Sequence, residues 1–263
     1  SEMCIRDRVS SVSVGYDNYD VPYFNERGIM LTNTPDVLTE STADLAFALL
    51  MSSARRVAEL DAWTKAGQWK ASVGAPLFGC DVHGKTLGIG GMGNIGAAVA
   101  RRGRLGFNMP ILYSGNSRKT QLEQELGAQL RSLDQLLAEA DFVCLVVPLS
   151  DKTRHLISTR ELGLMKSSAI LINISRGPVV DEPALIEALQ TQKIRGAGLD
   201  VYEQEPLAES PLFQLSNAVT LPHIGSATHE TREAMANRAL DNLRSALLGQ
   251  RPQDLVNPQV WKG

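Results

Sequence analysis

The stretch Thr86-Leu-Gly-Ile-Gly-Gly-Met-Gly-Asn-Ile-Gly96 decides the fold of this chain. Leu87 and Ile89 are typical of the end of a short buried strand, and the small residues Ala97-Ala-Val-Ala100 continue as a helix. The chain therefore passes from a strand through a glycine-rich turn into a helix, which is the context that gives such a turn its meaning.

Three glycines in this turn, Gly91, Gly93 and Gly96, match the pattern G-x-G-x-x-G. The first glycine allows a tight turn, the second lets a pyrophosphate approach the backbone, and the third lets the helix pack closely on the strand. Free amides and the helix dipole then favour an anion at the start of the helix. Glycine-rich turns are common, but the flanking strand and helix favour a dinucleotide site over a purely structural turn.

Composition narrows the classes of protein to consider. The chain has 263 residues, of which 43% are hydrophobic and 21% charged, as in globular proteins. A net charge of -3 argues against nucleic acid as a partner, and no stretch suggests a membrane span or a signal peptide. Three scattered cysteines, Cys4, Cys80 and Cys144, predict no disulfide framework and favour a reducing, cytoplasmic setting with Cys144 buried.

Strand and helix patterns alternate regularly after the glycine turn. The expected strands are residues 110–113, 142–147, 169–174, 196–201 and 219–221, and the expected helices are 120–126, 133–140, 159–165 and 182–190. Such alternation implies parallel pairing with helices on both faces, so the fold class is α/β with a Rossmann-type, doubly wound parallel sheet. Ligands of these sheets bind at the carboxyl ends of the strands.

The part before the glycine turn is less regular. Residues 1–8 have neither helical nor strand periodicity, and we expect them to lie outside the fold. Strands are expected at 9–14 and 29–31, with a short helix at 21–27 between them. Apolar residues at helical spacing then predict one long helix over 43–66.

The segment Tyr113-Ser-Gly-Asn-Ser-Arg-Lys119 bears on the choice of cofactor. Dinucleotide-binding folds usually place a carboxylate here, which binds the ribose 2′-hydroxyl of NAD, and this segment contains none. Ser117, Arg118 and Lys119 would instead suit a 2′-phosphate, so we expect NADP(H), with NAD(H) possible. The alternative is that Arg118 and Lys119 only form the solvated start of a helix.

Three polar residues follow three expected strands: Arg176, Glu205 and His223. Because the carboxyl ends of parallel strands meet at one edge, these side chains are candidates for a single cleft. An arginine can grip a carboxylate and polarise the adjacent carbonyl, while a histidine paired with a carboxylate can supply a proton. The other histidines, His83, His155 and His229, have no such carboxylate partner in the sequence pattern. No spacing of His and Cys residues suggests a metal site.

Together these motifs resemble one known family, the D-isomer-specific 2-hydroxyacid dehydrogenases. The resemblance spans Val9 to Pro258 and rests on six motifs in order: Ser13-Val-Gly-Tyr-Asp17, Thr34-Pro-Asp-Val-Leu-Thr39, the glycine turn, Asn173-Ile-Ser-Arg-Gly-Pro178, Gly198-Leu-Asp-Val-Tyr-Glu-Gln-Glu-Pro206 and Pro222-His-Ile-Gly-Ser-Ala-Thr228. It implies a dinucleotide-binding domain over 39–228. It also implies the remnant of a flavodoxin-like substrate domain, formed by 1–38 and 229–263, since family members carry further βα units ahead of Val14.

The resemblance also implies roles for individual residues. Arg176 would clamp the substrate, His223 would be the acid/base with Glu205 as its partner, and the amides of Val14 and Gly15 would hold the substrate carboxylate. The residues expected to line the cofactor are Gly91, Gly93, Asn94, Ile95, Gly96, Ser117, Arg118, Pro148, Thr153, Ile174, Asp200 and Gly225. A homodimer through the helix at 43–66 is implied as well.

The expected activity is reduction of a small 2-oxo acid, such as glyoxylate, hydroxypyruvate or 2-ketogluconate, by hydride transfer from NADPH. Two alternatives remain open at this point. One is a binding module of the same fold that senses a dinucleotide without turnover, and the other is an NAD-dependent dehydrogenase of another D-2-hydroxy acid.

Overall fold

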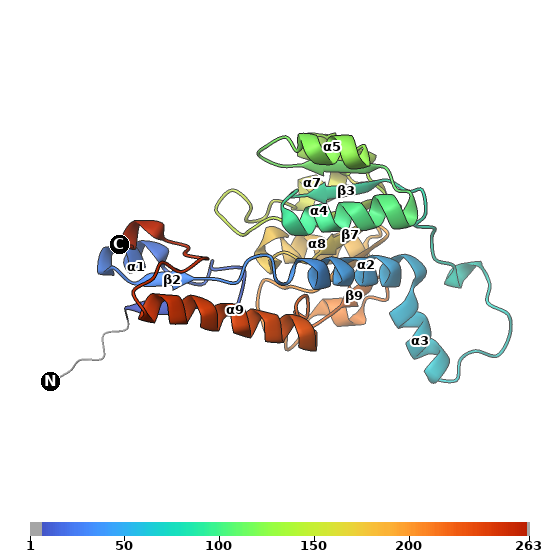
Figure 1. Cartoon of the computed structure of the whole chain (residues 1–263). Coiled ribbons are helices and arrows are strands. Elements are labelled where there is room, and N and C mark those ends of the chain that lie inside the picture. The colour runs from blue at the N-terminus through green and yellow to red at the C-terminus, as the bar shows by residue number, and fades with distance from the viewer. Residues whose placement is uncertain (1–6, 262–263) are drawn as a thin grey trace. The chain divides into compact units, whose positions relative to one another are not determined.

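The computed structural model describes residues 7–261 of the chain. The chain divides into two compact units (Figure 1). Unit 1 comprises Ser1–Ser41 and Ser226–Gly263, and unit 2 comprises Thr42–Gly225. No helix in the described part of the chain is both long and apolar enough to cross a membrane.

A parallel seven-stranded sheet forms the centre of unit 2 (Figure 1). Its strands, in the order β5-β4-β3-β6-β7-β8-β9, are β5 (Gln129–Leu130), β4 (Ile111–Ser114), β3 (Leu87–Gly90), β6 (Phe142–Leu145), β7 (Ile170–Asn173), β8 (Gly196–Leu199) and β9 (Ala218–Thr220). The chain order reverses on either side of β3, as in a doubly wound fold. The α/β prediction is confirmed, and only the short exposed strand β5 was missed.

Helices cover both faces of this sheet because alternate strand residues point to opposite sides. Ile170 and Ile172 of β7 join a buried cluster with α2, α4 and α5, whereas Leu171 joins a second cluster with α6, α7 and α8. The bounds are α2 (Thr39–Arg55), α4 (Asn94–Arg101), α5 (Thr120–Leu126), α6 (Leu133–Glu139), α7 (Thr159–Leu164) and α8 (Glu182–Gln190). Unit 2 therefore has two hydrophobic cores separated by the sheet.

The expected single helix over 43–66 is wrong. The chain instead forms α2, which ends at Arg55, and α3 (Val57–Lys65), with Arg56 between them in the left-handed conformation at φ 57°. The Arg56 guanidinium bonds the Glu59 carboxylate at 2.6 and 2.7 Å and so holds the break. Val57 fits a helical stripe in the sequence but is 54% exposed, so its spacing was misleading.

Unit 1 contains a parallel pair of strands, β1 (Arg8–Ser10) and β2 (Met30–Thr32), joined by helix α1 (Val21–Arg27). The long helix α9 (His229–Leu247) packs against both strands. Asn257 is fully buried; its side chain accepts a hydrogen bond from the Leu31 amide at 2.8 Å and donates to the Ile29 carbonyl at 2.9 Å. The end of the chain thus completes the small sheet formed by its beginning.

The predictions for the first residues need two corrections. The expected strand over 9–14 is shorter, since β1 ends at Ser10. Arg8, which was expected outside the fold, begins β1 opposite Met30, while residues 1–6 lie outside the described part. The remaining short helices are η1 (Ala75–Leu77), η2 (Arg102–Gly106), η3 (Gly177–Val179), η4 (Pro211–Gln214) and η5 (Pro258–Val260).

Candidate active site

Arg176 lies at the carboxyl edge of the sheet, three residues after the end of β7. The side chain of Asn173 builds the turn that presents it. Its amide group donates to the Arg176 carbonyl at 3.1 Å, and its oxygen accepts from the amide and the hydroxyl of Ser175 at 3.1 and 2.7 Å. Asn173 is 1% exposed, so the turn is fixed by a buried side chain whose oxygen and nitrogen are both hydrogen-bonded.

His223 and Glu205 form a close pair in the loops after β9 and β8. His223 Nδ1 lies 2.6 Å from Glu205 Oε2, and the two side chains are 47% and 34% exposed. The other oxygen of Glu205 accepts the Tyr202 amide at 3.0 Å, which fixes the carboxylate towards the histidine. With Nδ1 engaged, Nε2 is the imidazole nitrogen left for exchange of a proton with a ligand.

The loop of His223 is strained and is anchored from beneath by Asp200. His223 has φ 53°, a conformation that a non-glycine residue adopts rarely. The two oxygens of Asp200 accept the amides of Ile224 and Gly225 at 2.7 and 2.8 Å, and burial raises the pKa of this carboxyl although both bonds lower it. The buried carboxylate therefore stabilises the turn that carries the imidazole.

Tyr202 contacts all three loops that carry the candidate residues, namely the loops after β7, β8 and β9. Its hydroxyl donates to the carbonyls of Leu199 and Leu221, at the ends of β8 and β9, and burial raises its pKa to about 12. On the third side, a Cβ on Gly177 would lie 1.8 Å from the Tyr202 carbonyl, so only glycine allows this approach. Arg176 precedes Gly177, and hence the positions of all three candidate catalytic residues depend on one tyrosine.

The glycine turn has the geometry that a dinucleotide needs. Gly91 has φ 98°, and a Cβ on Gly96 would lie 2.2 Å from the Gly91 carbonyl oxygen, so both positions require glycine. A Cβ on Gly93 would meet nothing within 4 Å, which means that this face of the turn is open. A hollow of about 350 Å³ lies beside it and is lined by Met92, Gly93, Asn94, Ala97, Arg101, Lys119, Thr120, Gln121 and Leu122. The residues present therefore fit a pyrophosphate.

The other expected cofactor residues also follow the carboxyl ends of strands. Pro148 comes after β6, Ile174 after β7, Asp200 after β8 and Gly225 after β9, while Ile95 lies in the first turn of α4. Thr153 is engaged in its own turn, where its hydroxyl donates to the Pro148 carbonyl at 2.6 Å. This distribution follows the edge at which parallel sheets bind ligands.

Ser117 and Arg118 lie in the loop after β4, but Arg118 has a partner that the sequence reasoning missed. Its Nε atom bonds both oxygens of Glu123, at 2.8 and 3.1 Å, and this carboxylate also accepts the Tyr113 hydroxyl at 2.8 Å. Lys119, not Arg118, lines the hollow beside Gly93. Arg118 and Glu123 are five residues apart and Arg118 precedes α5, so the usual helical spacing of ion pairs did not indicate this contact.

The expectation that His155 lacks a carboxylate partner is wrong. Its Nε2 atom lies 2.7 Å from Glu203 Oε1, which makes a second histidine–glutamate pair two residues before Glu205. Glu203 also accepts the Glu182 amide at 3.3 Å. This pair joins the loop after β6 to the loop after β8.

Val14 and Gly15 belong to unit 1. The Val14 carbonyl accepts the side-chain amide of Asn33 at 2.9 Å, and the Gly15 carbonyl accepts the Ser13 hydroxyl at 2.5 Å. Within residues 7–261, the backbone amides of Val14 and Gly15 donate no hydrogen bond. The loop is thus held through its carbonyls, while its two amides donate to no acceptor within the described residues.

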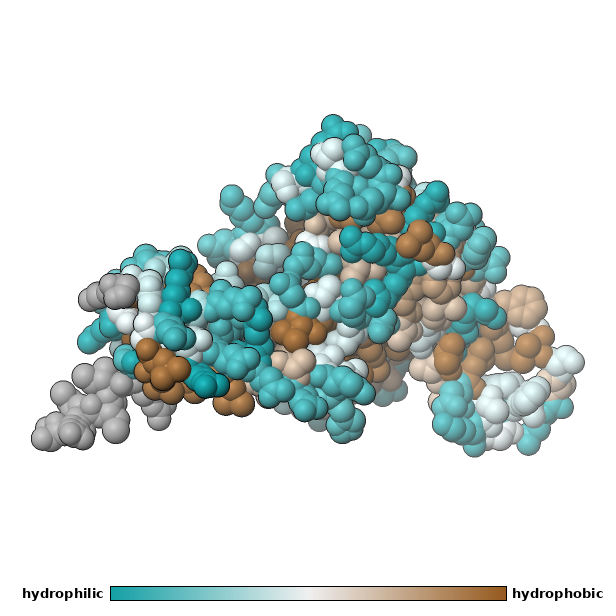
Figure 2. Space-filling view, viewed as in Figure 1, coloured by the Kyte–Doolittle hydropathy of each residue, from teal (hydrophilic) through white to brown (hydrophobic). Residues whose placement is uncertain are grey.

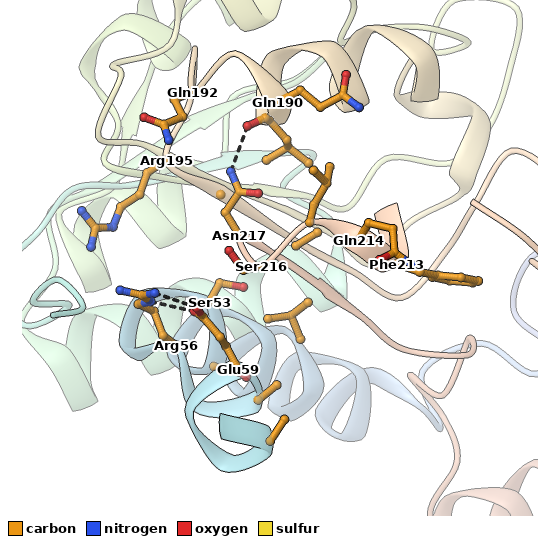
Figure 3. A pocket seen from close by; sticks show the side chains of 18 of the residues that line it. Ser53, Arg56, Glu59, Gln190, Gln192, Arg195, Phe213, Gln214, Ser216 and Asn217 are labelled. Carbon is orange, nitrogen blue, oxygen red and sulfur yellow. Dashed lines mark hydrogen bonds and ion pairs between the residues drawn. The ribbon is translucent and has the colours of Figure 1, made fainter. Parts of the chain in front are cut away.

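A larger hollow than the one beside Gly93 lies elsewhere in unit 2. It measures about 930 Å³ and lies at the amino ends of β8 and β9, beside the junction of α2 and α3 (Figure 3). Arg56 and Glu59 line it from below, and Asn217 donates to the Leu189 carbonyl at 3.1 Å on its other side (Figure 3). Size alone does not make it the active site, because His223 and Glu205 lie at the opposite ends of these strands.

Comparison with known proteins gives a consistent result. The family described as D-isomer specific 2-hydroxyacid dehydrogenase, NAD binding domain, matches residues 47–225. A protein named glyoxylate/hydroxypyruvate reductase B from Enterobacter sp. (strain 638) is 57% identical over 252 residues, which cover 95% of this chain and 78% of that protein.

Solved structures agree. An NADPH-dependent glyoxylate/hydroxypyruvate reductase from Sinorhizobium meliloti, in complex with NADP and malonate, is 35% identical with a TM-score of 0.88, over 96% of this chain and 78% of that one. A glyoxylate reductase from Paecilomyes thermophila is 40% identical with a TM-score of 0.88, over 96% of this chain and 76% of that one.

Proposed function

The chain belongs to the D-isomer-specific 2-hydroxyacid dehydrogenases, and from that premise we propose that it reduces small 2-oxo acids with NADPH. Glyoxylate, hydroxypyruvate and 2-ketogluconate are the proposed substrates, and D-2-hydroxy acids are the products. The observation that supports the proposal most is the 2.6 Å contact between His223 and Glu205, at the same edge of the sheet as the glycine turn.

Substrate binding is proposed to rest on Arg176 and on the loop of Val14 and Gly15. A guanidinium can bind a carboxylate through two parallel hydrogen bonds, and it can polarise the neighbouring carbonyl. The family resemblance also assigns the backbone amides of Val14 and Gly15 to the binding of a carboxylate. A 2-oxo acid held in this way presents its carbonyl carbon as the electrophile.

Proton transfer is proposed to come from His223. NADPH, when bound, would supply a hydride to the 2-oxo carbon, and negative charge would develop on the carbonyl oxygen. His223 Nε2 donates a proton to that oxygen, while Glu205 holds Nδ1 and stabilises the charged imidazole before transfer. The result is a hydroxy acid and NADP⁺.

Preference for NADPH over NADH is part of the proposal. The loop 114–119 after β4 contains no carboxylate and offers Ser117, Arg118 and Lys119. Arg118 is 71% exposed, which leaves its guanidinium accessible to a 2′-phosphate. Charge-assisted bonds to a phosphate are stronger than those between neutral groups.

Steady-state oxidation of NADPH, followed with each of the three 2-oxo acids, tests the function. We expect Arg176→Ala and His223→Ala each to lower turnover by about 10²- to 10⁴-fold, because each removes a group used in the transition state. Arg131→Ala and His83→Ala are matched controls that remove the same residue types elsewhere and should leave turnover unchanged. Normal rates in both site variants would overturn the assignment.

Fluorescence titration with NADPH, together with steady-state rates with NADPH and NADH, distinguishes the proposed reductase from the dinucleotide sensor and the NAD-dependent dehydrogenase. Saturable binding without turnover of any 2-oxo acid would favour a dinucleotide sensor of the same fold. Turnover with NADH at equal or higher kcat/KM would favour an NAD-dependent dehydrogenase. A tenfold preference for NADPH corresponds to about 1.4 kcal/mol, which one phosphate contact can supply.

The same family membership leads us to propose a homodimer. Hydrophobic side chains are exposed on α3 and the segment after it, which lie at the right of Figure 2, where brown surface is visible. These are Val57, Trp69, Val73 and Phe78. Exposed apolar clusters of this kind are typical of contact surfaces between subunits. Light scattering should therefore give twice the chain mass, and Trp69→Asp with Phe78→Asp should give the monomer mass.

A further inference from the structure

One buried hydroxyl closes the loop that follows β4. Tyr113 is the third residue of β4 and is fully buried. Its hydroxyl accepts the Lys119 amide at 2.8 Å and donates to Glu123 Oε1 at 2.8 Å. Residues 114–119 therefore form a loop whose two ends meet at Tyr113. Ser114 follows Tyr113 in the chain, and the Lys119 amide donates to its hydroxyl.

Glu123 transmits this anchor to Arg118. Its carboxylate, 14% exposed, accepts the Tyr113 hydroxyl and also receives Arg118 Nε on both oxygens. All hydrogen bonds that Arg118 makes within the described part of the chain use Nε. The two terminal amino groups of the guanidinium are thus available for a ligand, while the inner edge is fixed.

The buried Tyr113 hydroxyl contributes more to the ordering of Glu123 than the ion pair with Arg118 does. An exposed arginine–glutamate pair contributes little by itself, because ordering two long side chains opposes the attraction. Here the carboxylate is already ordered by a hydroxyl whose ring lies in the core. Burial raises the pKa of Tyr113, so its hydroxyl remains a donor at neutral pH; Arg118 and then Tyr113 lower the pKa of Glu123, which remains a carboxylate.

We propose that Tyr113 is a positioning residue for cofactor selection: through the Lys119 amide and Glu123 it holds the loop 114–119 and Arg118 in the arrangement that binds the 2′-phosphate of NADPH. The inference rests on the proposed preference for NADPH and adds residues that determine it. Tyr113 and Glu123 need not touch the cofactor.

Binding, without turnover, tests this directly. Fluorescence titrations of NADPH and NADH give a ratio of dissociation constants for the unchanged protein and for each variant. Calorimetric titrations of 2′,5′-ADP and 5′-AMP give the same ratio without the nicotinamide. Tyr113→Phe removes the hydroxyl and keeps the ring, so we expect the preference for the 2′-phosphate to fall roughly fivefold or more in both ratios, as when a charge-assisted contact is misplaced.

A second variant keeps the charges constant. Glu123→Asp retains the carboxylate but shortens it, so that it no longer bridges Tyr113 and Arg118, and we expect a similar fall in the ratio. Glu125→Asp makes the same change on the same helix without touching either partner, and its ratio should not change. Melting temperatures of all variants report whether the fold is retained.

A double-mutant cycle shows whether Tyr113 acts through Arg118. Arg118→Ala should lower the preference by itself, and adding Tyr113→Phe to it should lower the preference by less than in the unchanged protein. A folded Tyr113→Phe or Glu123→Asp variant that keeps its preference within twofold would overturn the inference and leave the proposed function intact. Absence of any NADPH preference in the unchanged protein would overturn the cofactor proposal, and this inference with it.

Discussion

Gly93 and Gly96 offer a matched test of how the glycine turn works. Gly93 has φ -81° and ψ -162°, which any residue can adopt, and an added Cβ would meet no heavy atom within 4 Å. Gly93→Ala should therefore fold normally, with a loss of about 1 kcal/mol at most from its place at the helix N-cap. The new methyl group would, however, face the open side where a pyrophosphate must approach, so NADPH affinity should fall at least about tenfold, or 1.4 kcal/mol.

Gly96→Ala should instead lower the stability of the fold itself. The added Cβ would lie 2.2 Å from the Gly91 carbonyl oxygen and 3.2 Å from its carbon, and both are backbone atoms that cannot rotate aside. Helix α4 must then move away from β3. Overpacking of this kind costs about 1–3 kcal/mol, so the free energy of unfolding should fall by that amount even without cofactor.

Urea unfolding followed by circular dichroism and NADPH titration followed by fluorescence measure the two effects separately. Gly106→Ala is the control, since a Cβ there also meets nothing within 4 Å and Gly106 lies outside the glycine turn. It should change neither quantity. Unchanged NADPH affinity in Gly93→Ala, or a greater loss of stability there than in Gly96→Ala, would refute the reasoning.

Further predictions concern three other sites. Gly177→Ala places a Cβ 1.8 Å from the Tyr202 backbone and should lower kcat by roughly 10²-fold through misplaced groups; a normal kcat would contradict the connecting role of Tyr202. Burial raises the pKa of Asp254, but hydrogen bonds from Arg238 and Asn242 outweigh it and keep the pKa below 3.8, so its stabilisation is complete above that value and is lost as pH falls through the folded-state pKa. Asp254→Ala should therefore cost about 3 kcal/mol in urea unfolding at pH 7 and less at pH 3, and a constant difference would exclude this origin. Ser132→Ala removes the capping box of α6 and should cost about 1 kcal/mol by the same assay.

Much of unit 2 could be predicted from the sequence because local signals and tertiary packing agree there. Ser132 caps α6, Gly127 follows α5, and every strand expected after the glycine turn forms within two residues of its predicted ends. The pairing of His223 with Glu205 was also expected, since both follow neighbouring strands.

Other features could not be predicted because they depend on contacts between distant residues or on unusual backbone conformations. Arg56 breaks a helix without being glycine or proline, and no local pattern indicates a positive φ there. The contact of His155 with Glu203 spans 48 residues and forms only once the sheet has assembled. Tyr113 looks like any buried strand residue, and its hydroxyl acquires partners only when the following loop closes.

The hydrogen bonds of Asn257 have a consequence for synthesis on the ribosome. Its side chain bonds Leu31 and Ile29, and Leu255 bridges Thr32, so the small sheet formed by the first described residues needs the last part of the chain. All residues of the seven-stranded sheet emerge earlier, and domains fold as units while translation proceeds. Unit 1 can therefore be completed only after unit 2 has been made, and a nascent chain whose residues up to about 240 have left the ribosome should protect the large sheet from protease while residues 7–41 remain cleavable.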